Sequence, residues 1–228
     1  MKLGLFGGSF DPIHRGHVLP VQAARRALGL DKVLFLPTAR PPHKPRQALA
    51  PPHARYAMVE MALLDEEGLF VSPFELTLDR PAYSVETLEH FRSSEPAADL
   101  VLMMGGDSFA DLHHWVRWRE IPGLARVVVL ARPGWDLEER ALPPELKELA
   151  HSDRVVFLRQ PPVDVSATRL REMFAADPSN DACPLLAKAP RRSASFMRPS
   201  RRLRPRRMCP HRRIRTAHRS RSSYRSTS

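Results

Sequence analysis

The stretch LGLFGGSFDPIHRGH, residues 3–17, joins an apolar run to glycines, a proline and two histidines. The apolar run predicts a buried first strand, and the two glycines after it allow the backbone to turn tightly and approach a ligand closely. Asp11-Pro12 predicts a turn, and the next helix is expected to begin near Arg15. The free N–H groups at that helix start would point into the same turn, where they favour anions.

The two histidines of this stretch are three residues apart. His14 and His17 can therefore lie on the same side of the helix start. Two imidazoles and free backbone N–H groups around one cavity would form a phosphate-binding site. The alternative is a glycine-rich turn with two solvated histidines. Neither the Walker pattern G-x-x-x-x-G-K-[ST] nor the dinucleotide pattern G-x-G-x-x-G is present.

From residue 3 to about 176, short apolar runs that end in Gly or Pro alternate with helix-like segments. The runs lie at 3–6, 33–37, 100–106, 127–134 and 155–158, and the helix-like segments at about 16–29, 53–66, 84–94, 107–121, 137–150 and 166–175. Strands rich in Val and Leu, separated by helices, predict βαβ units. We therefore expect an α/β fold, a Rossmann-like, doubly wound and mostly parallel sheet with helices on both faces. Ligands of such sheets bind at the carboxyl ends of the strands, near a switch in strand order.

The basic charge of the chain lies at its C-terminal end. The 228 residues carry a formal net charge of +11. Residues 178–228 contain 14 Arg, one Lys and one Asp, so they carry +14 and residues 1–177 carry −3. Arg, Ser and Pro dominate this end, which is expected to be disordered on its own. We therefore predict a domain of residues 1–176 and a basic tail of residues 177–228.

Other features of the sequence bound the class of protein. No apolar run approaches the roughly 18 residues of a membrane span, and the N-terminus lacks the apolar segment and cleavage site of a secretory signal. Two cysteines, Cys183 and Cys209, do not indicate a disulfide framework. We expect a soluble cytoplasmic protein with no membrane partner. The sequence does not indicate an oligomeric state.

The opening stretch also resembles a known signature. GGSFDPIHRGH is similar to the motif of the HxGH nucleotidyltransferase superfamily and, within it, to bacterial nicotinate-nucleotide adenylyltransferases. Five further segments resemble motifs of that family, in the family's order: LPTARPPHKP (36–45), RPAYSVETL (80–88), MGGDSFADLHHWVRWREI (104–121), ARPG (131–134) and VDVSATRLR (163–171). Six motifs in order make this resemblance specific.

The resemblance implies a reaction and its partners. ATP and nicotinate mononucleotide would give deamido-NAD, the nicotinate dinucleotide, and pyrophosphate. Catalysis would consist of positioning and of charge stabilisation, without a covalent intermediate. Mg²⁺ would be held by the ATP phosphates and water, because the sequence shows no cluster of protein ligands.

The resemblance also assigns residues to three roles. The catalytic residues would be His14, His17 and Arg171, which bind the ATP phosphates. The remaining ATP-binding residues would be Gly7, Gly8, Ser9, Phe10, Gly105, Asp107, Arg132, Ser166 and Thr168. The residues that bind nicotinate mononucleotide would be His43, Lys44, Tyr83, Ser84, Thr87, Trp115 and Val116. Among these, Trp115 would stack on the pyridine ring, while the backbone N–H groups of Ser84 and Val116 would bind the nicotinate carboxylate.

Several of these residues have simpler interpretations. Asp107 and Ser166 could be plain helix N-caps, and Trp115 could be a core residue of an amphipathic helix. Trp118 is the better core candidate, because it does not match the motif position. The loop around His43 and Lys44 could be ordinary surface. Ala167 stands where the family usually has a second Ser, so this chain lacks that hydroxyl group.

The tail departs from the family, whose sequences continue into a polar loop and a final amphipathic helix. Two origins remain open: a shift of reading frame in GC-rich DNA, or a genuine basic extension that binds RNA or DNA. Two other functions also remain open. The first is a different HxGH enzyme, such as a phosphopantetheine adenylyltransferase or a cytidylyltransferase, and the second is a nucleic-acid-binding protein that acts through the tail. The PPHK loop and Trp115 argue against the first, and the acidic charge of residues 1–177 argues against the second.

Overall fold

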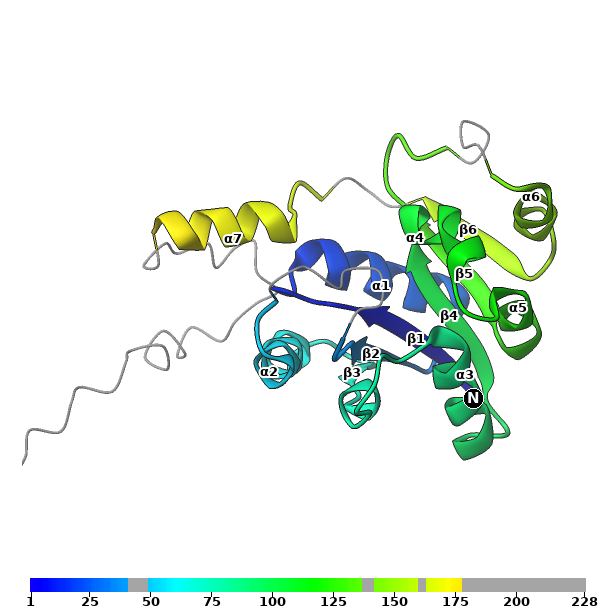
Figure 1. Ribbon diagram of the computed structural model, residues 1–228, viewed down its shortest axis with the longest axis horizontal. Coiled ribbons are helices and arrows are strands. Elements are labelled where there is room, and N and C mark those ends of the chain that lie inside the picture. Colours follow the sequence, from blue (N-terminus) through cyan, green and yellow to red (C-terminus); the bar gives the residue numbers. More distant parts are fainter. Residues whose placement is uncertain (41–48, 137–141, 160–162, 178–228) are drawn as a thin grey trace, which may run out of the picture. The chain divides into compact units, whose positions relative to one another are not determined.

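The computed structural model describes residues 1–40, 49–136, 142–159 and 163–177. Within them, one parallel sheet has the strand order β3-β2-β1-β4-β5-β6 (Figure 1). The strands are β1 (Lys2–Gly8), β2 (Lys32–Pro37), β3 (Leu69–Val71), β4 (Asp99–Gly105), β5 (Arg126–Ala131) and β6 (Val155–Arg159). The expected Rossmann-like parallel sheet is confirmed.

The helices follow the strands in alternation. They are α1 (Arg15–Leu28), α2 (Pro52–Leu63), α3 (Ser84–Ser94), α4 (Gly106–Ala110), α5 (Ile121–Leu124), α6 (Pro144–Ala150) and α7 (Ala167–Ala176), with short 3₁₀ turns η1 (Phe74–Leu76), η2 (Leu112–His114) and η3 (Trp118–Glu120). None of the helices in the described part of the chain is long and apolar enough to cross a membrane.

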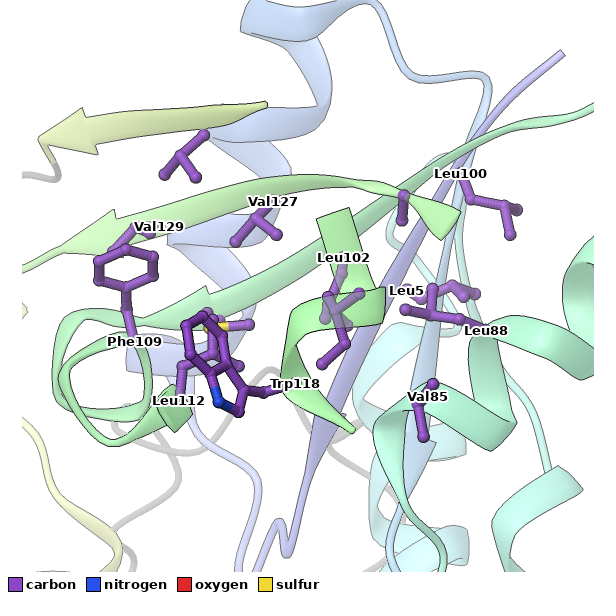
Figure 2. Close-up of a cluster of buried hydrophobic side chains, with 14 of the residues drawn as sticks. Leu5, Val85, Leu88, Leu100, Leu102, Phe109, Leu112, Trp118, Val127 and Val129 are labelled. Atoms are coloured by element: carbon purple, nitrogen blue, oxygen red, sulfur yellow. The ribbon is translucent and has the colours of Figure 1, made fainter. Parts of the chain in front are cut away.

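The core lies on both faces of the sheet because side chains alternate along each strand. Leu100 and Leu102 of β4 belong to one cluster, together with residues of α3, α5 and α6. Val101 and Met103 of the same strand belong to a second cluster, with residues of α1 and α2. Figure 2 shows part of the first cluster, in which Leu5 of β1 lies beside Leu88 of α3, and Val129 of β5 lies beside Phe109 of α4. Strands buried on both faces explain the continuous apolar runs of the sequence.

The strand order places a switch point beside β1. β1 pairs with β2 on one side and with β4 on the other. The connections after β1 and β4 therefore start at adjacent strand ends and lead away in opposite directions, which leaves a crevice between them. The opening motif follows β1, and the motif of residues 104–121 begins at the end of β4.

The observed elements differ from the expected ones at three places. β3 was not predicted, because a three-residue edge strand with Phe70 exposed carries no periodic signal. The segment 107–121 is not one helix, since Trp115 is extended and Arg117 has a φ of 54°, which a right-handed helix does not admit. Of the helix expected at 137–150, residues 137–141 lie outside the described residues, and the described helix α6 begins at Pro144, where proline occupies the first turn.

Candidate functional site

The opening turn begins two residues later than expected, after Gly8 instead of after residue 6. Gly7 and Gly8 lie within β1 rather than after it, so the turn itself depends on other residues. Phe10 has a φ of 45° and its side chain is buried. A Cβ on Gly8 would lie 2.9 Å from the Phe10 ring, whereas a Cβ on Gly7 would meet nothing within 4 Å. Gly8 is therefore required by the packing of Phe10, and Gly7 faces open space.

The two histidines of the motif lie together. His14 is the N-cap residue of α1, and its backbone N–H donates to Nδ1 of His17 over 3.3 Å. The two rings stack with their centroids 3.8 Å apart. His14 is only 3% exposed, so the alternative of two solvated histidines is wrong for this residue.

His14 is neutral at pH 7 in this structure. Burial, and secondarily the positive charge of Arg132, lower the pKa of His14 to about 4. Its buried Nδ1 has no hydrogen-bond partner among the described residues. A buried nitrogen without a partner costs free energy. A ligand group that hydrogen-bonds to this ring would remove that cost.

The last described helix meets the opening turn, although the two are far apart in sequence. The Ser166 hydroxyl accepts a hydrogen bond from the backbone N–H of Arg169 at 3.2 Å, so the predicted N-cap is confirmed. One guanidinium nitrogen of Arg171 donates to the Asp11 carbonyl at 2.5 Å and another donates to the Thr168 hydroxyl at 3.2 Å. Arg171 thus joins the start of α7 to the turn before α1.

A cavity of about 1090 Å³ opens at the carboxyl ends of β1, β2, β4 and β5. Most of the residues predicted to bind the two nucleotides line it: Gly7, Gly8, Ser9, Phe10, His17, Tyr83, Ser84, Thr87, Gly105, Asp107, Trp115, Val116 and Arg132. His14, Ser166, Thr168 and Arg171 do not line the cavity, although His14 stacks on His17, which does. His43 and Lys44 lie outside the described residues.

The two tryptophans near the cavity have different environments. Trp118 is 8% exposed and belongs to the first core cluster, as expected. Trp115 is half-buried, packs against that cluster and lines the cavity. It lies in extended backbone between two 3₁₀ turns, so its interpretation as a residue of a regular amphipathic helix is wrong. Asp107 is not an N-cap either, because Gly105 occupies that position of α4.

Comparisons with known proteins agree with this geometry. The family model described as cytidylyltransferase-like matches residues 5–173. A probable nicotinate-nucleotide adenylyltransferase of Thermus thermophilus is 42% identical over 171 residues, which cover 75% of this chain and 85% of that one. A relative with the same description from Shewanella putrefaciens is 40% identical over 192 residues, covering 77% and 88%. The chain belongs to the nicotinate-nucleotide adenylyltransferase family.

Solved structures show the same fold. The nicotinic acid mononucleotide adenylyltransferase of Plasmodium falciparum, complexed with NaAD, superposes with a TM-score of 0.61 at 13% identity, over 75% of this chain and 82% of that one. A putative nicotinate-nucleotide adenylyltransferase of Vibrio parahaemolyticus superposes with a TM-score of 0.54 at 18% identity, over 82% and 94%. At these identities the likeness concerns the fold alone.

Two buried charged residues near the cavity, Arg55 and Glu75, lie outside the six motifs and were not predicted from the sequence. Arg55 is fully buried and donates to the carbonyl oxygens of Ser9 at 2.6 Å and Ala50 at 2.9 Å. Arg55 lies four residues before the apolar Val59, and this helical spacing could have indicated that Arg55 faces the buried side of α2. Glu75 is 6% exposed and lines the cavity. No pattern in its neighbourhood pointed to Glu75.

Proposed function

We propose that this chain transfers the adenylyl group of ATP to nicotinate mononucleotide, which gives deamido-NAD and pyrophosphate. The observation that carries the proposal is a single cavity at the switch point, lined both by the HxGH residue His17 and by Trp115 with Ser84. It brings together motifs that lie far apart along the chain. Two relatives that bear the name of this activity, at 42% and 40% identity, support it.

The reaction requires positioning rather than a protein nucleophile. A phosphate oxygen of the mononucleotide attacks the α-phosphorus of ATP, a new phosphoanhydride bond forms, and the bond to pyrophosphate breaks. We propose that His14 and His17 bind the ATP phosphates. Neutral imidazole N–H groups can donate to phosphate oxygens, and these contacts strengthen as charge moves to the leaving pyrophosphate.

The start of α7 supplies the second part of the proposed phosphate site. Helix N-termini favour anions, and Ser166 and Thr168 lie in the cap and first turn of α7. Arg171 has a planar fork of donors suited to phosphate. Its bond to the Asp11 carbonyl fixes it beside the opening turn. We propose that these three residues bind the β- and γ-phosphates.

The rest of the ATP would lie across the ends of β1, β4 and β5. We propose that Gly7, Gly8, Ser9 and Phe10 line the cleft shared by the two substrates. Gly105 and Arg132 would contact adenine through their backbones, and Asp107 would bind ribose hydroxyls. All of these residues line the same cavity.

The mononucleotide would occupy the side of the cavity that α3 and residues 115–116 form. We propose that Trp115 stacks on the pyridine ring and that Tyr83 and Thr87 shape its pocket. The backbone N–H groups of Ser84 and Val116 would bind the nicotinate carboxylate. His43 and Lys44 would bind the mononucleotide phosphate, with Lys44 as the principal contact.

A divalent metal belongs to the proposed reaction. Among the described residues, no three His, Cys, Asp or Glu side chains gather to hold an ion. Mg²⁺ favours phosphate oxygens and water with few protein ligands, and Arg132 and His17, which line the cavity, suit a bound polyphosphate that could supply those oxygens. We propose that the ATP phosphates and water hold Mg²⁺, which would neutralise charge on the leaving pyrophosphate.

The decisive experiment measures pyrophosphate release by the full chain with ATP and Mg²⁺. Nicotinate mononucleotide, nicotinamide mononucleotide and 4′-phosphopantetheine serve in turn as acceptor. We expect release with the first and at most weak release with the second. Release with 4′-phosphopantetheine alone would assign the chain to another branch of the HxGH enzymes. A folded chain, verified by circular dichroism, that is inactive with all three would refute the proposal.

We also propose the division into a domain of residues 1–176 and a basic tail of residues 177–228. The family model ends at residue 173, which supports a boundary near this point. Sequencing the gene through codons 170–180 separates the two origins of the tail, since an intact frame excludes a frame shift. A cytoplasmic location stays a prediction from the sequence.

A further inference from the structure

Glu75 is a buried carboxylate that the proposed reaction does not use. It lies in the 3₁₀ turn η1, between β3 and α3, and is 6% exposed. It also lines the nucleotide cavity, on the side where Tyr83 and Ser84 begin α3. Burial of an ionisable group is costly unless hydrogen bonds compensate it. We therefore ask which groups donate hydrogen bonds to this carboxylate.

Both carboxylate oxygens accept hydrogen bonds from hydroxyl groups of different elements. Oε2 of Glu75 accepts from the Thr38 hydroxyl at 2.7 Å, and Oε1 accepts from the Thr87 hydroxyl at 3.1 Å. Burial raises the pKa of Glu75, and these two hydrogen bonds oppose that rise. Glu75, Thr38 and Thr87 all line the cavity.

The two threonines belong to different elements that line the cavity. Thr38 directly follows β2, and its backbone N–H donates to the carbonyl of Gly8 at 3.0 Å. Thr87 lies in the first turn of α3, and its backbone N–H donates to the carbonyl of Tyr83 at 3.1 Å. A continuous chain of hydrogen bonds therefore runs from the end of β1, through Glu75, to the start of α3.

The position of α3 determines where the acceptor nucleotide can bind. Tyr83 and Ser84 begin this helix, whereas Gly8 belongs to the cleft shared with ATP. An apolar side chain at position 75 could fill the same volume but could not join the two threonines. Fully satisfied buried polar networks specify one geometry, and a misplacement of about 1 Å can cost about 100-fold in rate.

We propose that Glu75 is a positioning residue for the acceptor mononucleotide, which fixes the start of α3 relative to the ends of β1 and β2 by binding the hydroxyls of Thr38 and Thr87. This inference rests on the proposed function, because it concerns the acceptor side of that site. Glu75 need not touch either substrate.

The test compares Glu75→Leu with Glu75→Gln in steady-state kinetics of the full chain. Leucine cannot bind either hydroxyl, so we expect KM for nicotinate mononucleotide to rise at least tenfold while KM for ATP changes less than twofold. Glutamine keeps the shape and offers one acceptor and one donor group. A threonine hydroxyl can serve as either partner, so we expect Glu75→Gln to restore most of the acceptor affinity.

Thr38→Val provides a second variant if Glu75→Leu does not fold. It removes one of the two hydroxyls and should raise KM for the acceptor in the same direction. In a double-mutant cycle, adding Thr38→Val to Glu75→Leu should raise KM for the acceptor by less than a further twofold, because both changes remove the same hydrogen-bonded connection. Glu86→Leu is the matched control, since Glu86 lies in the same helix turn as Thr87 but bonds the exposed Arg80.

The outcomes separate this inference from the proposed function. A wild-type chain that does not use nicotinate mononucleotide refutes the proposed function and this inference with it. If the wild-type chain is active, an equal rise of both KM values, or wild-type kinetics in folded Glu75→Leu, refutes the positioning role alone. A Glu75→Gln variant as impaired as Glu75→Leu also contradicts it.

Discussion

At the residue scale, the most informative side chain is the buried histidine of the opening motif. His14 is neutral because burial and Arg132 both disfavour its charged form. A polyphosphate bound beside it would reverse the balance, since negative charge favours imidazolium. The ligand-free protein thus keeps a histidine whose proton affinity should respond to ATP.

We predict that His14 titrates near pH 4 in the free protein and at higher pH with ATP bound. Its pKa in the unfolded chain is about 6.5, so the unfolded state binds a proton first as pH falls. The contribution of His14 to the free energy of unfolding is therefore complete above pH 6.5 and is lost as pH falls towards 4. NMR titration of the imidazole checks the pKa, and His14→Gln should flatten this part of the stability profile. A free-protein pKa near 6.5 would contradict the prediction.

Substitution of Trp115 should affect mainly substrate binding, whereas substitution of Trp118 should affect mainly the stability of the fold. Trp115→Ala should raise KM for nicotinate mononucleotide about tenfold or more, because stacking on an aromatic ring contributes about 1–3 kcal/mol. The thermal stability of the Trp115→Ala variant should change little, since Trp115 is only half-buried. Trp118→Ala should instead lower the free energy of unfolding by about 3–5 kcal/mol. Steady-state kinetics and urea unfolding of both variants measure the difference, and the reverse pattern would exclude the proposed stacking role.

At the element scale, α7 connects the late motif to the opening turn. Its contact with the rest of the protein includes Leu170, which has no exposed surface, and the bond of Arg171 to the Asp11 carbonyl. The helix has ten residues, too few to be stable alone in water. Its docking therefore decides where its N-terminus, with Ser166 and Thr168, points.

Leu170→Ala should loosen this docking. Removal of a buried leucine side chain costs about 2–5 kcal/mol, and we expect a lower melting temperature together with a higher KM for ATP. Arg169→Ala is the control on the same helix, because its side chain is exposed and pairs with the exposed Asp164 at 3.6 Å. The free energy of unfolding of the Arg169→Ala variant should stay within about 0.5 kcal/mol of the wild-type value. Calorimetry with ATP kinetics tests both, and unchanged ATP kinetics in Leu170→Ala would show that α7 does not set the phosphate site.

At the scale of the whole molecule, two parts of the chain have opposite charge. Residues 1–177 carry −3 and residues 178–228 carry +14. A basic segment attracts polyanions whatever its origin, and such binding weakens steeply with salt. Nucleic-acid binding by this chain, if observed, would therefore belong to the tail and not to the nucleotide cavity.

We predict that the full chain binds duplex DNA at about 50 mM salt and loses most of this affinity at about 200 mM, whereas a chain of residues 1–177 binds at neither salt concentration. Fluorescence anisotropy with a labelled duplex measures both, and pyrophosphate release by the shorter chain serves as the control for folding. Salt-insensitive or sequence-specific binding would indicate a dedicated nucleic-acid site instead.

The fold was predictable to a large extent because its signals are local. Val- and Leu-rich runs such as 100–106 and 127–134 became β4 and β5, and the helix at 84–94 was predicted with its observed bounds. The interrupted segment after β4 was not predictable, because the extended Trp115 and the positive φ of Arg117 depend on packing that periodicity does not record. β3 was not predicted because a strand of three residues is too short to show an alternation of apolar and polar side chains.

By itself, the sequence determined the class of sheet, the family and the residue types of the phosphate motif, since these depend on short patterns that do not need a third dimension. Only the tertiary structure decided that Arg171 meets Asp11 across 160 positions, and that Glu75 joins Thr38 to Thr87. It also decided that His14 is buried and neutral. Desolvation and hydrogen bonding depend on which distant segments fold against one another, and a linear pattern does not contain that information.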